Sequence, residues 1–400
     1  MRTGQSHLFI PGPTNVPEAV RQAMNVPMQD MRAPDFGDLT LDLFKGLKRV
    51  LRTEKGHAMI FPGSGTGAWE AAITNTLNPG DKVLMARYGH FSTLWVEMAT
   101  RLGLDVEVID IAWGAGVPVK DISRRLGRDT KDEIKAVFVT HNETATGVTS
   151  SIQEVRNALD ENFHDALLFV DGVSSIGSLD FRMDEWEVDL IVAGSQKGLM
   201  LPAGLGILGI SEKALEASKT STMRRAYFEF SDMLNMNAGG YFPYTPPTQL
   251  LHGLKKSLER LEEEGMDQVI ARHYRLAEGI RRGVAAWDME LVAEHHTLYS
   301  DTVSAIRVPT NVDARDVIRI AYEEFSTSFG SGLGPLGGRV FRIGHIGDLN
   351  EAMCLTALSV AEMALSRAGA QMKFGSGVAA AQAWFSEEMR SSSHLKLAAE

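Results

Sequence analysis

Two residues of opposite charge, Asp171 and Lys197, each follow an apolar segment with the composition of a buried strand. Asp171 comes directly after "ALLFV", and Lys197 comes shortly after "DLIVAG". Taken singly, the lysine is explained by a strand end that reaches water, and the aspartate by a turn or a helix cap. Taken together, they point to one crevice, because parallel strands present their carboxyl ends at the same edge of a sheet.

An acid and an amine in one crevice suit the chemistry of pyridoxal phosphate (PLP). That cofactor needs a lysine to form a Schiff base and a carboxylate that keeps its ring nitrogen protonated. The lysine must lose its proton before it attacks, and a partly desolvated site favours this by lowering its pKa. Once substrate has displaced it, the same amine can act as general acid and base. The pair therefore predicts a PLP enzyme in which Lys197 and Asp171 are catalytic.

A glycine-rich segment, "FPGSGTGAWEAA", is suited to the phosphate of such a cofactor. Gly63, Gly65 and Gly67 follow an apolar strand and open a helix, whose N–H groups and positive end attract anions. Ser64 and Thr66 add hydroxyl groups. The segment lacks the lysine of a P-loop and the spacing of the dinucleotide fingerprint, so an ordinary turn is the alternative interpretation.

Two further segments carry polar residues that could face a substrate. Arg342 stands among apolar neighbours in "RVFRIGH", where it either pairs with a structural carboxylate or clamps a substrate carboxylate. The polar loop "THNETATGVTSS" follows the strand "KAVFVT" and would bring Asn142, Glu143 and Thr144 to the same crevice. Both segments are therefore candidates for the substrate side of the site.

The elements that must position these residues alternate between strand and helix patterns, which predicts parallel βαβ units. Residues 1–17 carry three prolines and predict an extended arm. A long helical stretch, interrupted near Gly265, is followed by segments that predict the strands of a smaller α+β domain. The predicted fold class is α/β, with a large domain over residues 18–255 whose mainly parallel sheet is flanked by helices. A smaller C-terminal domain covers residues 256–400.

The overall composition argues against several classes of protein. A net charge of −11 and a pI of about 5.5 do not suit a nucleic-acid-binding surface. The single cysteine, Cys354, excludes an internal disulfide, and its apolar helical segment predicts a buried, inert thiol. No apolar run reaches the length of a membrane span and no secretory signal is present, so a cytoplasmic protein is expected. The histidines lack metal-ligand spacing, and no metal is expected.

Six motifs, taken together, resemble those of the class V, fold-type I aminotransferases, and most of all the serine–glyoxylate and alanine–glyoxylate group. In this sequence they read PGPTN, HNETATG, FVDGVSSIGSLDFRMDEW, GSQKGLMLPAGLG, FPYTPP and VFRIGH. The resemblance extends from His7 to about Phe385. It implies a large PLP-binding domain, a smaller C-terminal domain, and a homodimer or a pair of dimers whose active sites are shared between subunits.

The resemblance also implies a role for each residue that matches the family's cofactor site. Lys197 would carry PLP as a Schiff base, and Asp171 would pair with the ring nitrogen. Val173 and Phe91 would pack on the two faces of the ring, and Thr144 would lie near the ring hydroxyl. The residues implied to hold the phosphate are Ser64, Gly65, Thr66 and Gln196, together with Thr245 and Tyr244 from the second subunit.

On the substrate side, the resemblance places Asn142 beside the substrate and Arg342 on its α-carboxylate, with Pro11 and Gly12 closing over the site. The implied reaction moves an amino group from a small L-amino acid to glyoxylate by ping-pong chemistry and yields glycine and a 2-keto acid. Serine is the favoured donor, which would give hydroxypyruvate. Aspartate and alanine stay open as donors, and a PLP-binding protein without catalysis is a remote alternative.

Overall fold

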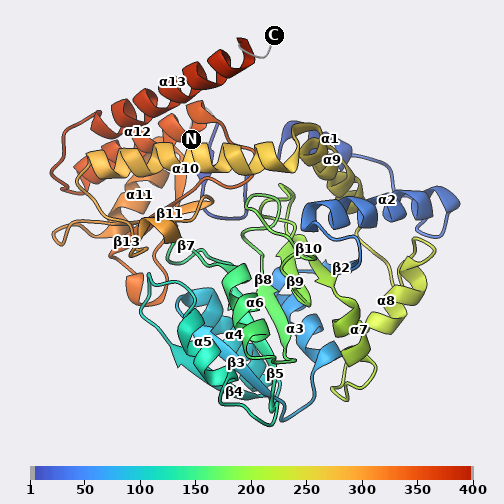
Figure 1. Cartoon of the computed structure of the whole chain (residues 1–400). Helices are drawn as coiled ribbons and strands as arrows, with labels where there is room; N and C mark the ends of the chain where they lie inside the picture. Colours follow the sequence, from blue (N-terminus) through green and yellow to red (C-terminus); the bar gives the residue numbers. More distant parts are fainter. Residues whose placement is uncertain (1–4, 398–400) are drawn as a thin grey trace.

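A seven-stranded sheet lies at the centre of the larger part of the molecule (Figure 1). The computed structural model describes residues 5–397, with the backbone alone for residues 388–397. Across the sheet the strands are β2 (His57–Gly63), β10 (Gly204–Ile210), β9 (Leu190–Gly194), β8 (Leu167–Asp171), β5 (Ile134–Thr140), β3 (Lys82–Arg87) and β4 (Asp105–Asp110). Neighbours are parallel except that β10 is antiparallel to both β2 and β9. The predicted α/β fold with a mainly parallel sheet is confirmed.

Helices cover this sheet, and two of them bear directly on the site. α3 (Gly65–Thr76) packs on β9 and β10, and α4 (His90–Arg101) packs on β3 and β4. Strands β8 and β9 are buried over their whole length, as expected for a sheet covered on both faces. The other helices of this part are α1 (Glu18–Ala23), α2 (Pro34–Leu51), α5 (Val119–Leu126), α6 (Ile152–Glu161), α7 (Glu212–Ser218), α8 (Phe230–Asn237) and α9 (Thr248–Glu264). The predicted polar loop after β5 contains a small hairpin, β6 (Asn142–Glu143) with β7 (Val148–Thr149).

A four-stranded sheet supports the smaller part, which lies above the larger one in Figure 1. Its strands, in order, are β1 (His7–Phe9), β12 (Thr327–Ser331), β13 (Val340–Gly344) and β11 (Val303–Arg307). Since β1 pairs in parallel with β12, part of the predicted arm is a strand of this sheet. The helices here are α10 (Met266–Ala286), α11 (Ala314–Phe325), α12 (Glu351–Arg367), α13 (Ser376–Leu397) and the 3₁₀ turns η1 (His296–Leu298) and η2 (Gly334–Leu336).

The buried apolar side chains form two main clusters, one around each sheet. The first includes residues as far along the chain as Val269, and the second includes Phe9 and residues from Leu276 onward. Helix α10 therefore contributes to both clusters. The domain boundaries at 17/18 and 255/256 stay predictions.

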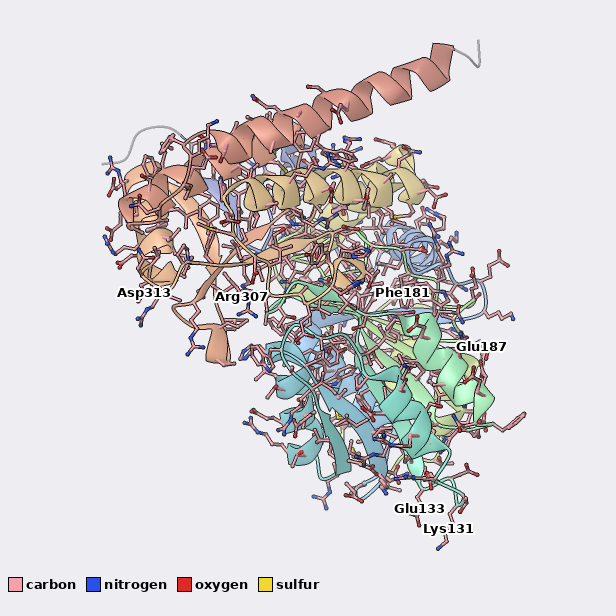
Figure 2. The ribbon with its side chains drawn as sticks, turned by 60° about the vertical axis from the view of Figure 1, so that its left-hand side comes forward. Lys131, Glu133, Phe181, Glu187, Arg307 and Asp313 are labelled. Carbon is pink, nitrogen blue, oxygen red and sulfur yellow. The ribbon has the colours of Figure 1, made fainter. Side chains whose placement is uncertain are left out.

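The two parts extend in opposite directions. In the rotated view of Figure 2, Arg307 and Asp313 mark the smaller part, whereas Lys131 and Glu133 mark the far end of the larger one. Cys354 is 1% exposed in α12, where burial raises the pKa of its thiol to about 12, so the predicted buried thiol is confirmed. Within residues 5–397, no helix combines the length and apolar character needed to cross a bilayer.

Candidate active site

The carboxyl ends of β8 and β9 open on a cavity of about 330 Å³. The residues that the sequence analysis singled out and that line it are Gly12, Ser64, Gly65, Thr66, Phe91, Asn142, Thr144, Asp171, Val173, Gln196 and Lys197. Four other candidates, Pro11, Arg342, Tyr244 and Thr245, do not line this cavity. The fold therefore gathers into one place residues that are far apart along the chain.

Asp171 and Lys197 enter this cavity from neighbouring parallel strands. Asp171 is the last residue of β8, and Lys197 follows the end of β9. Burial raises the pKa of the Asp171 carboxyl to about 7. Burial, assisted by the nearby Arg342 guanidinium, lowers the pKa of the Lys197 ammonium to about 8. The cavity thus holds an acid and an amine that both titrate near neutral pH, the range in which a group exchanges protons efficiently.

The N-terminal arm packs directly on the turn that carries Lys197. The Lys197 ammonium donates a hydrogen bond to the Pro11 carbonyl. Thr14 donates its hydroxyl to the Lys197 carbonyl at 3.2 Å and its amide to the Gln196 carbonyl at 3.1 Å. Gly12 has φ +118°, and a Cβ at this position would overlap the Lys197 side chain. Glycine is therefore required where the arm passes the amine.

The N-terminus of α3 supplies an anion-binding edge to the cavity. Ser64 caps the helix, with its Oγ accepting a hydrogen bond from Gly67 N at 3.3 Å. The first N–H groups of a helix have no acceptor inside the helix, and the helix dipole adds positive potential there. Gln196 lines the same cavity, and the nitrogen of its side-chain amide is a hydrogen-bond donor. These groups could hold a phosphate.

Glu143 is a fully buried carboxylate that joins two walls of the site. It accepts hydrogen bonds from Phe91 N at 3.0 Å, Ser92 N at 2.9 Å and Ala145 N at 3.1 Å. Burial raises the pKa of Glu143, while the backbone donors at the start of α4 stabilise its charged form. The carboxylate therefore fixes Phe91 relative to Thr144, and both of those residues line the cavity.

Substitution of Gly89, the N-cap of α4, should test how rigidly Glu143 is held. A Cβ at Gly89 would overlap the Glu143 side chain, which cannot move without losing its hydrogen bonds. We expect Gly89→Ala to lower the free energy of unfolding by about 1–3 kcal/mol, the usual cost of overpacking. Chemical denaturation measures this change. Gly63→Ala is the control, because a Cβ there meets nothing within 4 Å. An equal effect of the two substitutions would contradict the prediction.

Arg342 lies in β13, immediately behind the cavity wall. Its Nε donates to the Ser331 carbonyl and its Nη1 to the Thr144 carbonyl, both at 2.9 Å. Burial lowers the pKa of the Arg342 guanidinium to about 10, which leaves it charged at neutral pH. Its Nη2 makes no hydrogen bond to residues 5–397.

Asn142 borders the cavity, but its amide is engaged in a buried polar network. The amide nitrogen donates to Ser174 Oγ at 2.8 Å and to Thr302 Oγ1 at 2.9 Å. The amide oxygen accepts from Thr149 Oγ1 at 2.9 Å. Because Thr302 immediately precedes β11, this network links the two parts of the molecule. A direct contact of Asn142 with substrate stays a prediction.

Tyr244 and Thr245 lie outside the cavity, near the end of β2. Tyr244 stacks on Tyr227 with ring centroids 4.2 Å apart and donates its hydroxyl to the Tyr227 carbonyl at 2.9 Å. Tyr227 in turn donates to the Pro62 carbonyl at 3.2 Å. Thr245 is exposed. The roles of Tyr244 and Thr245 in a second subunit stay predictions.

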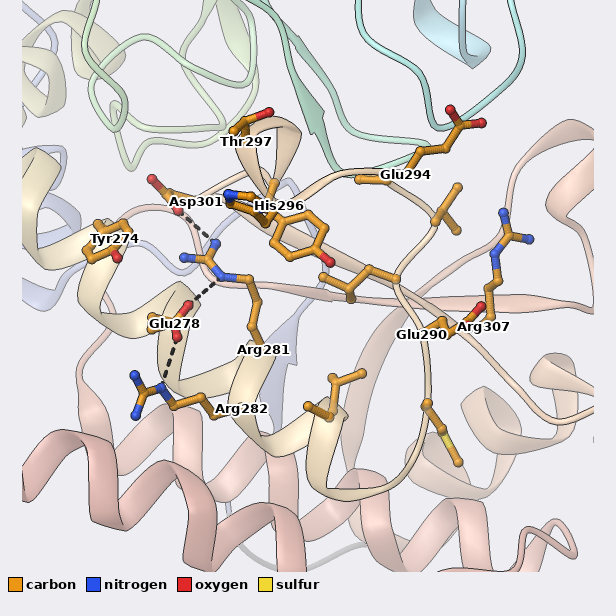
Figure 3. Close-up of a pocket in the computed structure, with 17 residues that line it drawn as sticks. Tyr274, Glu278, Arg281, Arg282, Glu290, Glu294, His296, Thr297, Asp301 and Arg307 are labelled. Atoms are coloured by element: carbon orange, nitrogen blue, oxygen red, sulfur yellow. Dashed lines mark hydrogen bonds and ion pairs between the residues drawn. The ribbon is translucent and has the colours of Figure 1, made fainter.

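A larger cavity, of about 1010 Å³, lies in the smaller part between α10 and β11 (Figure 3). Four of its charged side chains are paired with one another. Arg281 bonds to Glu278 at 3.0 Å and to Asp301 at 2.8 Å, and Arg282 bonds to Glu278 at 2.9 Å. Lys197 and Asp171 do not line it, so the smaller cavity is the better candidate for chemistry.

The chain matches the family model described as aminotransferase class V over residues 7–326. It is a class V aminotransferase. The resemblance noted in the sequence is thereby confirmed, and family membership implies a PLP-dependent reaction.

Several relatives of this class V aminotransferase match nearly the whole chain. A serine–glyoxylate aminotransferase of Hyphomicrobium methylovorum is 58% identical over 383 residues, which are 95% of either chain. An L-aspartate–glyoxylate aminotransferase of Paracoccus denitrificans is 52% identical and covers 95% of this chain and 96% of its own. The crystal structure of ureidoglycine–glyoxylate aminotransferase from Bacillus subtilis superposes with a TM-score of 0.89 at 25% identity, covering 96% of this chain and 99% of its own.

Some residues that line the cavity of this aminotransferase, notably Trp69 and Ser174, were not predicted from the sequence. Trp69 follows Gly65 by four residues in α3 and so shares a helix face with it, which is a signal that could have found it. The sequence predicted that Glu143 lies at the crevice but indicated no function for it. Its three backbone donors come from α4 and from its own loop, and only the folded chain brings them together.

Proposed function

We propose that this chain transfers an amino group from a small L-amino acid, with serine favoured, to glyoxylate, using PLP held at Lys197. The observation that carries the proposal is the convergence of a buried amine and a buried acid in one cavity, with the Arg342 guanidinium behind its wall. The names of the relatives, which include serine–glyoxylate and L-aspartate–glyoxylate aminotransferases, support glyoxylate as the acceptor.

The residues of the cavity fit PLP in charge and in shape. The start of α3 and Gln196 offer donors for a phosphate, and Val173 and Phe91 line the space that an aromatic ring would occupy. Burial raises the pKa of the Asp171 carboxyl, and a protonated ring nitrogen would give its charged form a cationic partner. Thr144 would lie near the ring hydroxyl. When bound, the cofactor supplies an electron sink that stabilises negative charge at the substrate Cα.

The chain's own residues have distinct tasks in this proposal. Lys197 Nζ would hold the cofactor, and the same amine, when free, would accept the proton from the donor Cα. Asp171 holds the proton on the ring nitrogen. Pro11 and Gly12 cover the amine and limit access of water, which strengthens the electrostatic interactions inside the cavity.

The donor is chosen by the charges that surround the substrate. Arg342 binds the α-carboxylate in this proposal, through the guanidinium group that the Thr144 and Ser331 carbonyls hold in place. Among the described side chains that line the cavity, Lys197 is the one cation. An aspartate donor would need a further cation for its second carboxylate, supplied by another subunit. The lining therefore favours serine, with aspartate and alanine as the alternatives.

The proposed assembly is a homodimer with shared active sites, in which Tyr244 and Thr245 of each chain approach the phosphate bound by the other. Tyr227, beside Tyr244, is 44% exposed, and such a large exposed aromatic side chain is suited to an interface. Pairing of dimers into a tetramer is compatible with this arrangement.

Half-reactions followed by absorption spectroscopy test the proposed function. PLP-loaded protein is mixed separately with serine, aspartate and alanine, and glyoxylate is then added. We expect serine to bleach the yellow absorbance fastest and glyoxylate to restore it with formation of glycine. A faster response to aspartate or alanine would reassign the donor. Colour that responds to none of the three would favour the PLP-binding protein without catalysis.

The pH dependence of PLP uptake is a further prediction. Lys197 must be neutral to attack the cofactor aldehyde, and burial lowers the pKa of Lys197 from 10.5 to about 8. The uptake rate should therefore rise with pH, with a midpoint near pH 8. Stopped-flow absorbance on the PLP-free protein measures it. A midpoint close to 10.5, the value of an ordinary lysine, would contradict the burial of the amine.

A further inference from the structure

Trp69 carries a buried polar atom for which the polypeptide provides no hydrogen bond that meets normal geometry. The residue lies in α3, lines the same cavity as Asp171 and Lys197, and is 3% exposed. Its indole Nε1 makes no hydrogen bond within residues 5–397. A buried donor left unpaired is destabilising, so its retention at a ligand cavity calls for a physical reason.

Asp171 lines the same cavity as this indole and carries a carboxylate that can accept a hydrogen bond. One carboxylate oxygen, Oδ1, accepts from Val173 N at 3.0 Å, and Oδ2 accepts no hydrogen bond from the described part of the chain. The Trp69 N–H lowers the pKa of Asp171, whereas burial raises this pKa by a larger amount.

The surrounding aromatic side chains fix the plane of the indole. Trp69 stacks on Trp95 with ring centroids 5.4 Å apart and an interplanar angle of 17°. Trp95 in turn meets the edge of Phe138 at 4.8 Å. Trp95 also has a buried Nε1 without a partner among the described residues, but it does not line the cavity. Trp95 is therefore a matched control for Trp69: each indole N–H is buried without a partner, but only Trp69 of the two lines the cavity that holds Asp171.

We propose that Trp69 is a positioning residue that donates its indole N–H to Asp171, and that this bond keeps the carboxylate ionised and oriented for the PLP ring nitrogen. The proposal rests on the proposed function, because it assumes that PLP occupies this cavity. A hydrogen bond donated to a carboxylate favours its charged form, and the charged form in turn favours the proton on the ring nitrogen. Trp69 thus acts on the chemistry through Asp171.

Nitrogen-15 NMR of the holoenzyme tests this role without measuring turnover. The protein is loaded with PLP labelled at the ring nitrogen, whose chemical shift reports protonation, and Asp171→Asn marks the unprotonated limit. We expect Trp69→Phe to move the shift toward that limit, with the ratio of protonated to unprotonated ring falling about tenfold, as for loss of one hydrogen bond to a charged group. Trp95→Phe is expected to keep the wild-type shift.

A wild-type shift in PLP-loaded Trp69→Phe would overturn the inference, as would an equal change in Trp95→Phe. If Trp69→Phe fails to fold or to bind PLP, the same comparison is made with benzothienylalanine at position 69, which keeps the ring size and lacks the N–H. A wild-type protein that never takes PLP onto Lys197 would defeat the proposed function as well. A protonated ring in the wild type with no response at position 69 would defeat only the role of Trp69.

Discussion

Lys197→Ala is expected to lower kcat/KM for transamination by at least about 10⁴-fold, since one side chain performs both attachment of the cofactor and proton transfer. No other lysine lines the described cavity, so the chain offers no replacement amine there. Glycine formation from glyoxylate and donor measures the loss. Borohydride reduction should fix PLP to the wild-type protein at position 197 and leave the variant unlabelled.

A surface lysine provides the control for this experiment. Lys213 pairs with the exposed Asp165 at 3.0 Å and lies outside the cavity. Lys213→Ala should retain wild-type turnover and borohydride labelling. Activity of Lys197→Ala within tenfold of the wild type would refute the assignment of Lys197, because no route through another amine of the cavity exists in the described chain.

Arg342→Gln is expected to lower kcat/KM about 10²-fold for the amino donor and for glyoxylate alike. Both substrates carry the carboxylate that Arg342 is proposed to bind, and a hydrogen bond to a charged group contributes about 1.5–3 kcal/mol. The loss should be larger in KM than in kcat, since the interaction exists before the chemical step. Steady-state kinetics with each substrate varied in turn measures the split.

Arg339→Gln is the matched control, because Arg339 is exposed and directly precedes β13 in the chain. Its substitution should leave both KM values unchanged. If Arg342→Gln destabilises the fold through the lost contacts with Ser331 and Thr144, the melting temperature will report it separately. Unchanged KM values in a folded Arg342→Gln protein would show that another group binds the carboxylate.

The positions of Asp171 and Lys197 were predictable because local apolar runs define where a buried strand ends. β8 and β9 are parallel neighbours, which brings both residues to one edge of the sheet, although no helix separates the two strands in the described chain. Strand β10 escaped prediction. Its sequence, GLGILGI, contains three glycines, which weaken the strand signal, and its antiparallel direction depends on pairing with two distant partners.

The orientation of the side chains within the site could not be predicted from the sequence. The amide of Asn142 is held by Thr302, a residue 160 positions away. Glu143 is held by the start of α4, about 50 positions earlier in the chain. Such contacts join residues that share no local pattern, so the residue type alone does not reveal whether a polar group faces the ligand or the protein.

The opening residues of the chain contact both the four-stranded sheet and the turn that carries Lys197. β1 is hydrogen-bonded to β12, while Pro11 and Thr14 of the same segment contact Lys197. Any molecule that binds more tightly when this segment covers the amine must, by thermodynamic linkage, strengthen the docking of β1 by an equal free energy. Ligand binding at Lys197 and detachment of β1 from β12 are thus linked by a single equilibrium, and a change in one changes the other.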